Sequence, residues 1–272
     1  MSLYTILGGS GFIGSEVTRQ LQKNGYNVFI PERNDKDILK RELGIIIYCV
    51  GSGDCENLPF SVFDANVKLL SDIIINGKFK KIIYLSSTRL YMNNITSVEE
   101  SDFIIGHQDN RRLFNLTKLV AEELCLKSSY NILIVRPSNV YGAAFSSPLF
   151  LPSITRDAIN KGIVNMYVSP NYSKDYVSVS DVANAIVKLS LLEKTKYKIY
   201  NLAYGKNVSA NEIASVLIKK TKCEVNWIYN HFDEKFPVTS IDRIKSEISY
   251  KPRFILKDLE KMVDDFRAFL KK

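Results

Sequence analysis

The stretch RRLFNLTKLVAEEL, residues 111–124, carries two side chains whose spacing bears directly on chemistry. Phe114 precedes Lys118 by four residues, and in an amphipathic helix side chains at this spacing lie one above the other on one face. The pair sets an ammonium group beside an aromatic ring that has no proton to transfer. Any acid–base step on this face therefore needs a group other than Phe114.

Histidine chemistry has little support in this sequence. Its two histidines, His107 and His231, lie in polar stretches, and neither has a second histidine nearby. This weakens the case for a zinc site of the H-E-x-x-H type and for a Ser-His-Asp triad. No metal site is expected, so chemistry must use other side chains or a cofactor.

A glycine triplet follows the first apolar run of the chain. In GGSGFIG, Gly8, Gly11 and Gly14 follow a predicted strand and open a predicted helix. Such glycines permit a tight turn, a close approach of backbone amides to a pyrophosphate, and close packing of helix on strand. The alternative is a merely tight turn. The context predicts a dinucleotide site formed by Gly8, Ser10, Gly11, Phe12, Ile13 and Gly14.

The residue that reads the adenosine ribose is expected at the end of the second strand. The sequence there is FIPERND, with Glu32 and Arg33 adjacent. An acid at this place suits the ribose hydroxyl of NAD, whereas an Arg suits the 2′-phosphate of NADP. Either side chain could also simply face solvent. Arg33, followed by a polar loop that could wrap a phosphate, favours NADP, with NAD as the alternative.

The first half of the chain alternates between predicted strands and helices. Asn24-Gly25 and Asn76-Gly77 are helix stop signals. Continuous apolar runs such as GIIIYCVG are typical of strands buried on both faces. Strands are predicted at 3–9, 26–30, 44–51, 80–87 and 131–138, and helices at 12–24, about 35–43, 60–77 and 110–128. Repeated β-α units predict an α/β fold, a doubly wound parallel sheet with right-handed crossovers.

After Pro137 the pattern is looser. Helices are predicted near 149–161, within 175–192, at 209–221 and at 256–270, with strands in DYVSVS, YKIYNLA and EVNWIY and a further short helix. We expect a dinucleotide-binding domain of 1–138 plus about 175–204. A smaller α+β substrate-binding lobe would comprise about 139–174 plus 205–272.

Composition sets the broad class. The 272 residues are 46% hydrophobic and 24% charged, as in ordinary globular domains. No apolar run reaches the ~18 residues of a membrane span, and no secretory signal opens the chain. The formal charge of +8 is scattered, without a long basic tract or nucleic-acid motif, so we expect neither a membrane nor a nucleic-acid partner. Cysteines without C-x-x-C spacing predict reduced thiols in a cytoplasmic protein: Cys49, Cys55, Cys125 and Cys223.

Four segments, in their order along the chain, resemble the extended short-chain dehydrogenase/reductase family, in the branch that acts on nucleotide sugars. They are GGSGFIG, YLSSTRLY, FNLTK and RPSNVYG. SKDYVSVSDVANAI and YNLAYGKNVSANEIA are similar to later segments of that branch, so the resemblance runs from residue 3 to about residue 265. It implies a Rossmann domain, NADP or NAD as cofactor, and a nucleoside-diphosphate sugar as substrate.

The resemblance also implies catalytic positions. Family members use a Ser or Thr, a Tyr and a Lys, which correspond here to Ser87, Phe114 and Lys118. Ser87 would hydrogen-bond the reacting oxygen of the substrate, although a helix-capping serine is a rival interpretation. Lys118 would bind the nicotinamide ribose and lower the pKa of a Tyr from its unperturbed ~10.

Phe114 departs from the family pattern and leaves three interpretations open. It can be an engineered substitution that traps a bound ligand, which the otherwise intact site favours. It can be natural, with another group or water supplying the proton. The protein can also be a non-catalytic dinucleotide sensor. A purely structural role for Phe114 is the weaker interpretation, because an apolar stripe already runs through Leu113, Leu116, Val120 and Leu124.

Four further positions correspond to substrate contacts in the family. Thr88 neighbours Ser87, and Asn139 matches an Asn that contacts the phosphate or sugar, unless it is only a turn residue. Lys174 stands where the family often has Arg, which replaces a bidentate fork with a point charge. Arg253 is a further candidate phosphate partner.

The resemblance leads to a specific functional expectation. The short chain and the abbreviated segment between the second and third strands favour a 4-keto-6-deoxy sugar nucleotide reductase. An epimerase or dehydratase of the same family is the alternative. In this family, helices equivalent to 60–77 and 110–128 pair across a two-fold axis, so a homodimer is expected.

Overall fold

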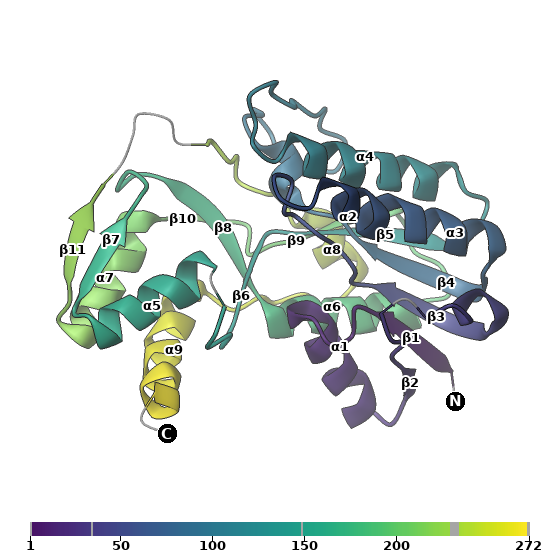
Figure 1. Cartoon of the computed structure of the whole chain (residues 1–272), viewed down its shortest axis with the longest axis horizontal. Helices are drawn as coiled ribbons and strands as arrows, with labels where there is room; N and C mark the ends of the chain where they lie inside the picture. The colour runs from purple at the N-terminus through teal and green to yellow at the C-terminus, as the bar shows by residue number, and fades with distance from the viewer. Residues whose placement is uncertain (1, 34, 148, 229–233, 271–272) are drawn as a thin grey trace.

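The computed structural model describes residues 2–33, 35–147, 149–228 and 234–270. A six-stranded sheet forms the centre of the larger part of the molecule (Figure 1). Its strands pair in the order β2-β1-β3-β4-β5-β9, all parallel. The strands are β1 (Leu3–Leu7), β2 (Asn27–Phe29), β3 (Glu42–Tyr48), β4 (Lys78–Leu85), β5 (Ile132–Pro137) and β9 (Ile199–Leu202). The prediction of a doubly wound parallel sheet is confirmed.

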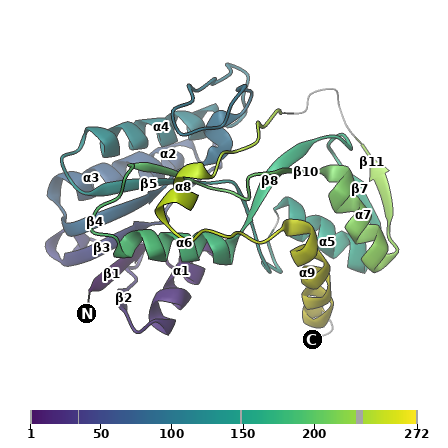
Figure 2. The same cartoon turned by 180° about the vertical axis from the view of Figure 1, so that it is seen from behind.

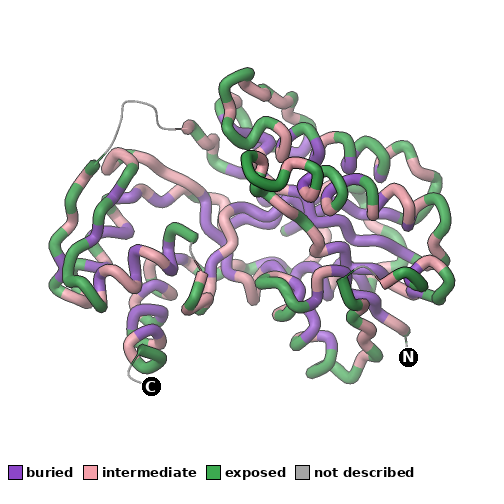
Figure 3. The backbone as a smooth tube through the Cα atoms, viewed as in Figure 1, coloured by how far each residue is buried: buried purple, intermediate pink, exposed green. Residues whose placement is uncertain are grey.

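Helices cover both faces of this sheet, because its central strands are apolar on both faces. α1 (Phe12–Lys23) and α6 (Val179–Leu191) pack side by side on one face. α2 (Pro59–Phe63), α3 (Leu69–Asn76) and α4 (Arg112–Lys127) lie on the other, as both views show (Figures 1 and 2). The sheet between the helices is buried along most of its length (Figure 3).

The predicted helix 60–77 contains an irregular turn. Between α2 and α3 the chain forms η2 (Asp64–Lys68), a π-helical turn that holds one more residue than an α-helical turn. Asn66 lies in this turn and is fully buried. Such turns are frequent at binding and catalytic sites, which directs attention to Asn66.

A buried ion pair ties α4 to the sheet. The guanidinium of Arg136 on β5 donates to both carboxylate oxygens of Glu122 on α4, and also to the hydroxyl of Tyr91. The side chains of Arg136 and Glu122 are only 2% and 3% exposed. Because a buried charge is costly without a partner, these residues depend on each other.

The smaller part contains two short sheets. β10 (Asn207–Ser209), β8 (Ser173–Ser178) and β6 (Asn139–Tyr141) form one, and β7 (Ile163–Met166) pairs with β11 (Glu224–Trp227) in the other. α5 (Phe150–Asn160), α7 (Ala210–Thr221) and α9 (Ile255–Leu270) pack on them around a second apolar core. α8 (Asp242–Glu247) belongs to the stretch predicted for this lobe, yet Ile241, Ile244 and Tyr250 pack into the core of the large sheet.

Several sequence predictions need correction. The helix expected at about 35–43 is wrong, since only the 3-10 turn η1 (Ile38–Lys40) forms there and β3 already begins at Glu42. The strands β6, β7 and β10 were not predicted. The alternation of apolar and polar residues in such short strands is too brief to distinguish them from loops.

The apolar stripe of α4 does not face the core. Leu116, Val120 and Leu124 are exposed, while Lys118 and its neighbours Thr117, Ala121, Glu122 and Cys125 are buried. The polar side of this helix packs inward because its buried charges find partners, whereas the leucine stripe remains on the surface. That stripe therefore gives no reason to exclude a packing role for Phe114.

Within the residues that the structure describes, no helix has the length and apolar character needed to cross a membrane. The same residues contain no group of three or more His, Cys, Asp or Glu side chains placed to hold a metal ion.

Candidate active site

The glycine turn lies where β1 leads into α1. Gly8 has a φ of +77°, in the left-handed region that favours glycine, and the N–H of Gly11 donates to the carbonyl of Gly8 at 3.0 Å. A Cβ on Gly14 would come within 2.2 Å of the carbonyl oxygen of Gly8. A side chain at Gly14 therefore does not fit this turn, and the amides of the first turn of α1 have no partner within the helix.

This turn occupies the switch point of the sheet. From β1 the chain passes to β2 on one side and then to β3 on the other, so the carboxyl ends of β1 and β3 border a crevice. A Cβ on Gly8 would lie 3.0 Å from the carbonyl carbon of Cys49, which follows β3. Close backbones, free amides and a helix N-terminus at a switch point fit a dinucleotide pyrophosphate.

The residues predicted to read the ribose follow β2. Ile30 lies against Gly9, where an added Cβ would be 2.8 Å from its side chain, so the end of β2 borders the glycine turn. Glu32 and Arg33 come next in the chain and both are exposed. Among the described residues neither side chain has a hydrogen-bond or ion-pair partner, so both are open to a ligand.

Lys118 is deeply buried at the carboxyl ends of β3 and β4. Its ammonium donates to the carbonyl of Leu85 at 2.8 Å and lies 4.8 Å from the ring centroid of Tyr84. A Cβ on Gly51 would be 3.6 Å from this ammonium. Burial lowers the pKa of Lys118 to about 8, since water no longer solvates the charge.

Ser87 follows β4 two residues after Leu85. Its hydroxyl oxygen accepts the backbone N–H of Arg89 at 3.1 Å and so caps the 3-10 helix η3 (Thr88–Tyr91). The capping interpretation is thus present in the structure, yet the hydroxyl hydrogen remains available to donate. Ser87 thus follows by two residues the carbonyl of Leu85 that accepts the Lys118 ammonium, so both side chains belong to the carboxyl end of β4. Thr88 is buried within η3.

Phe114 is half-buried between two cations on its own helix. The Arg111 guanidinium carbon lies 4.4 Å from the ring centroid, and the Lys118 ammonium lies 5.8 Å from it. Aromatic faces attract cations at these distances. A hydroxyl on this ring would be in a positively charged environment.

Sequence reasoning missed Asn66. Its side-chain amide donates to the carbonyl of Ser52 at 3.1 Å and to the hydroxyl of Thr117 at 3.0 Å, and its oxygen accepts the N–H of Ser52. It therefore fixes the loop after β3 against α4, next to Lys118. A single buried Asn within a helix leaves no periodic signal, so the sequence alone could not reveal it.

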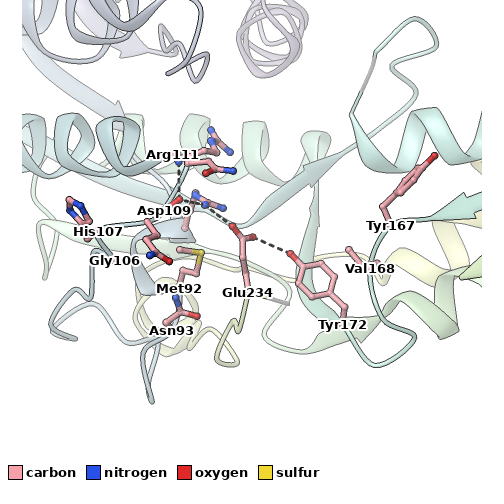
Figure 4. Close-up of a pocket in the computed structure, with 13 residues that line it drawn as sticks. Met92, Asn93, Gly106, His107, Asp109, Arg111, Tyr167, Val168, Tyr172 and Glu234 are labelled. Carbon is pink, nitrogen blue, oxygen red and sulfur yellow. Dashed lines mark hydrogen bonds and ion pairs between the residues drawn. The ribbon is translucent and has the colours of Figure 1, made fainter. Parts of the chain in front are cut away.

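A cavity of about 950 Å³ opens between the two parts of the molecule (Figure 4). One wall comes from η3 and the segment that leads into α4, and the other from the loop between β7 and β8 together with Glu234. Its lining residues are Arg89, Met92, Asn93, Gly106, His107, Gln108, Asp109, Asn110, Arg111, Tyr167, Val168, Tyr172 and Glu234. It adjoins Phe114 through Arg111. His231 lies outside the described residues.

Charged side chains link the walls of this cavity. Arg89 donates to Asp109 at 2.9 Å and to Glu234 at 2.7 Å, and the hydroxyl of Tyr172 donates to Glu234 at 3.2 Å. The ammonium of Lys174 lies 3.7 Å from a carboxylate oxygen of Glu234. The carboxylate of Glu234 thus joins the η3 wall to the β8 wall, and Arg89 holds the pKa of Glu234 below its ordinary value against the opposing effect of burial.

The predicted substrate contacts are not all near this cavity. Lys174 borders it through Glu234. Asn139 donates its side-chain amide to the carbonyl of Asp175 at 2.8 Å, which joins β6 to β8. Arg253 lies near Asp181 and Asp258, 3.6 and 3.4 Å from their carboxylates, and is not among the residues that line the cavity.

Comparisons with known proteins agree with this geometry. A dTDP-4-dehydro-6-deoxy-D-allose reductase from Streptomyces is 23% identical over 260 residues, covering 78% of this chain and 79% of that protein. A putative UDP-glucose 4-epimerase from Methanocaldococcus jannaschii is 26% identical, covering 78% and 80%.

A solved structure shares the fold. A mutant UDP-glucuronic acid 4-epimerase from Bacillus cereus, in which one Tyr is replaced by Phe, superimposes with a TM-score of 0.84 at 18% identity, covering 98% of this chain and 99% of that one. Its crystals contain UDP-4-deoxy-4-fluoro-glucuronic acid and NAD. The model of the NAD dependent epimerase/dehydratase family matches residues 4–203, and this chain belongs to that family.

Proposed function

We propose that this protein is an NAD(P)-dependent oxidoreductase that reduces a 4-keto-6-deoxy sugar bound to a nucleoside diphosphate. The observation that supports this most is that the buried Lys118 ammonium binds the carbonyl of Leu85, the last residue of β4, two residues before Ser87. The similar Streptomyces reductase supports the choice of reaction. The cavity between the two parts has the size of a ligand site and would hold the nucleotide sugar.

Each residue of the proposed site would have a distinct role in binding or catalysis. The dinucleotide, bound on Gly8, Ser10, Gly11, Phe12, Ile13 and Gly14, supplies hydride chemistry. Lys118 would bind the nicotinamide ribose and keep a positive charge beside the reacting centre. Ser87 would donate its hydroxyl hydrogen to the sugar oxygen, while the oxygen of that hydroxyl accepts the N–H of Arg89. Phe114 would shape the site without transferring a proton.

The dinucleotide is proposed to be NADP, with NAD as the alternative. Arg33 is exposed and free to bind a 2′-phosphate, while the adjacent Glu32 would suit the ribose hydroxyl of NAD. Titrating both oxidised dinucleotides against the wild-type protein and Arg33→Gln tests this. If NADP is preferred, the substitution should weaken NADP and leave NAD unchanged.

We propose that residues of the smaller lobe contribute to binding of the nucleotide sugar. Lys174, at the edge of the cavity, would contact the diphosphate as a point charge. Thr88 and Asn139 would support the sugar side through η3 and β6. Arg253 would need to leave Asp181 and Asp258 to reach a phosphate, so among the four its role depends most on a conformational change.

The absence of a phenol at position 114 favours a second candidate function, that of a binding protein without turnover. A protein that binds the dinucleotide and sugar nucleotide but lacks the proton-transferring phenol could act as a sensor. If Phe114 is an engineered substitution, the reductase is merely impaired. An epimerase or dehydratase of the same family is the alternative reaction, and the similar archaeal protein carries such a name.

One assay separates these functions. Purified protein is mixed with reduced NADP or NAD and dTDP-4-keto-6-deoxyglucose, and the nicotinamide absorbance is followed. A reductase consumes the reduced dinucleotide in stoichiometric amounts. An epimerase converts UDP-glucose without net consumption, and a sensor binds both ligands in calorimetry without converting either.

We also propose a homodimer in the cytoplasm. The surface of α2, α3 and α4 exposes the apolar side chains of Phe60, Phe63, Ile75, Leu116, Val120 and Leu124, and Phe60 is 85% exposed. An apolar surface of this kind marks an interaction site. The four cysteines are free thiols, as a reducing compartment requires. Light scattering of wild type against Phe60→Asp tests the dimer.

A further inference from the structure

Arg111 is held in place by two neighbours at the start of α4. Its guanidinium carbon lies 4.4 Å from the centroid of the Phe114 ring. A Cβ on Gly53 would come within 2.6 Å of its Nη2 atom, and within 3.8 Å of the Phe114 ring. A side chain at 53 would therefore push aside this guanidinium, which is the end of a flexible side chain and lies between the ring and the loop that follows β3.

The charge of Arg111 has no carboxylate partner among the described residues. The two carboxylates nearby, Asp109 and Glu234, bind Arg89, and Asp109 meets Arg111 only through the backbone N–H of that residue. Lys174 shares Glu234 with Arg89. Arg111 lines the cavity and is exposed, and in the described part of the chain its guanidinium has no side-chain hydrogen bond or ion pair, so its N–H donors are open to a ligand (Figure 4).

We propose that Arg111 binds the reacting oxygen of the sugar and stabilises the negative charge that develops on it, next to the ring that lacks a hydroxyl. This inference rests on the proposed reductase function and names the group that completes its site. A guanidinium offers several donors in a fixed fork and stabilises an oxyanion without giving up a proton. The guanidinium lies over the face of the Phe114 ring and lines the cavity, so its donors are open to a sugar oxygen bound beside that ring.

The step balances with water as the proton source. The carbonyl carbon receives hydride from the reduced dinucleotide, and the π electron pair of the C=O bond moves onto oxygen. Arg111 and Ser87 hold that oxygen while a water molecule gives it a proton and becomes hydroxide. Arg111 keeps its own proton, because the pKa of arginine stays far above neutral pH.

The test compares four variants in the assay with dTDP-4-keto-6-deoxyglucose. Arg111→Gln removes the charge and should lower kcat ~10²–10³-fold, as expected for an oxyanion donor. Arg111→Lys keeps the charge but not the fork and should lose less. Gly53→Ala displaces the guanidinium without altering it and should also lower kcat. Arg112→Gln is the matched control, because Arg112 is an exposed neighbour outside the cavity lining, and it should leave kcat unchanged.

Two further measurements distinguish this role from a structural one. In the Phe114→Tyr background a phenol shares the oxygen, so the loss caused by Arg111→Gln should shrink at least tenfold. Calorimetry should measure the affinity for the reduced product sugar nucleotide and the affinity for dTDP alone. If Arg111 binds the sugar oxygen, Arg111→Gln should weaken binding of the product more than binding of dTDP. An unchanged kcat, or an equal loss in both backgrounds, would overturn the role of Arg111 while the reductase remains. Absence of binding and turnover in both wild type and Phe114→Tyr would instead reject the reductase and this role with it.

Discussion

Replacing Phe114 with Tyr adds one hydroxyl to a ring that already lies between two cations. The Lys118 ammonium is 5.8 Å from the ring centroid and Arg111 is closer still. If the phenolate charge is placed at the ring centroid, one unit charge 5.8 Å away stabilises it by roughly 3 kcal/mol at an effective dielectric constant of about 20, which is about two pKa units. We therefore expect the new phenol to titrate well below its ordinary pKa of ~10.

A general acid in that position should raise turnover of dTDP-4-keto-6-deoxyglucose ~10²–10⁴-fold. Initial rates of nicotinamide oxidation, measured across pH, should contain an ionisation in the variant that the wild type lacks. Phe79→Tyr is a matched control, because Phe79 lies on β4 against Tyr130 and away from the cavity. The reasoning is refuted if Phe114→Tyr binds both ligands as the wild type does and yet turns over no faster.

Three other predictions concern the buried groups and the glycine turn. Burial lowers the pKa of Lys118 to about 8, so above that pH the unfolded chain binds more protons than the folded chain. The free energy of unfolding should therefore rise by up to about 3 kcal/mol between about pH 8 and 10.5. Urea titrations across this window should show the rise in the wild type and not in Lys118→Met. Arg136→Met leaves Glu122 buried without its partner and should lower the free energy of unfolding by about 3–5 kcal/mol. Adding Glu122→Leu should recover most of that loss, because no buried charge then remains unpaired. If chemical denaturation shows the double variant to be no more stable than Arg136→Met, the dependence of Glu122 on Arg136 is contradicted. Gly14→Ala places a Cβ 2.2 Å from the carbonyl of Gly8 and should weaken dinucleotide binding at least tenfold in fluorescence titrations, and an unchanged affinity would mean that this turn does not hold the pyrophosphate.

The sheet and the glycine turn could be predicted from the sequence for a physical reason. Strands buried on both faces are continuous apolar runs, and a helix that opens on glycines has a local signal, so β1, β3, β4 and α1 follow from short windows. The strands β6 and β10 have three residues each and exist only because β8 lies between them. Their formation depends on distant partners, which no local pattern records.

The candidate site likewise contains residues that the sequence could predict and residues that it could not. Ser87, Phe114 and Lys118 lie in segments with a recognisable order and spacing. Arg111 and Asn66 gain their importance from Gly53 and Ser52, which are distant in sequence and follow another strand. The exposed leucines of α4 illustrate a different limit of the sequence pattern. Apolar periodicity identifies one face of a helix, but it does not reveal whether that face packs on the core of this chain.

The π-helical turn η2 has a consequence for how this chain can tolerate insertions and deletions. Removing one residue from Asp64–Lys68 would convert α2, η2 and α3 into one regular helix, and every upstream side chain would rotate by about 100°. Asn66 could no longer reach Ser52, and Phe60 and Phe63 would emerge on a different side. A single-residue deletion there would alter the ligand crevice and the proposed subunit contact at once, so the length of this turn should be under stronger constraint than its amino-acid identities.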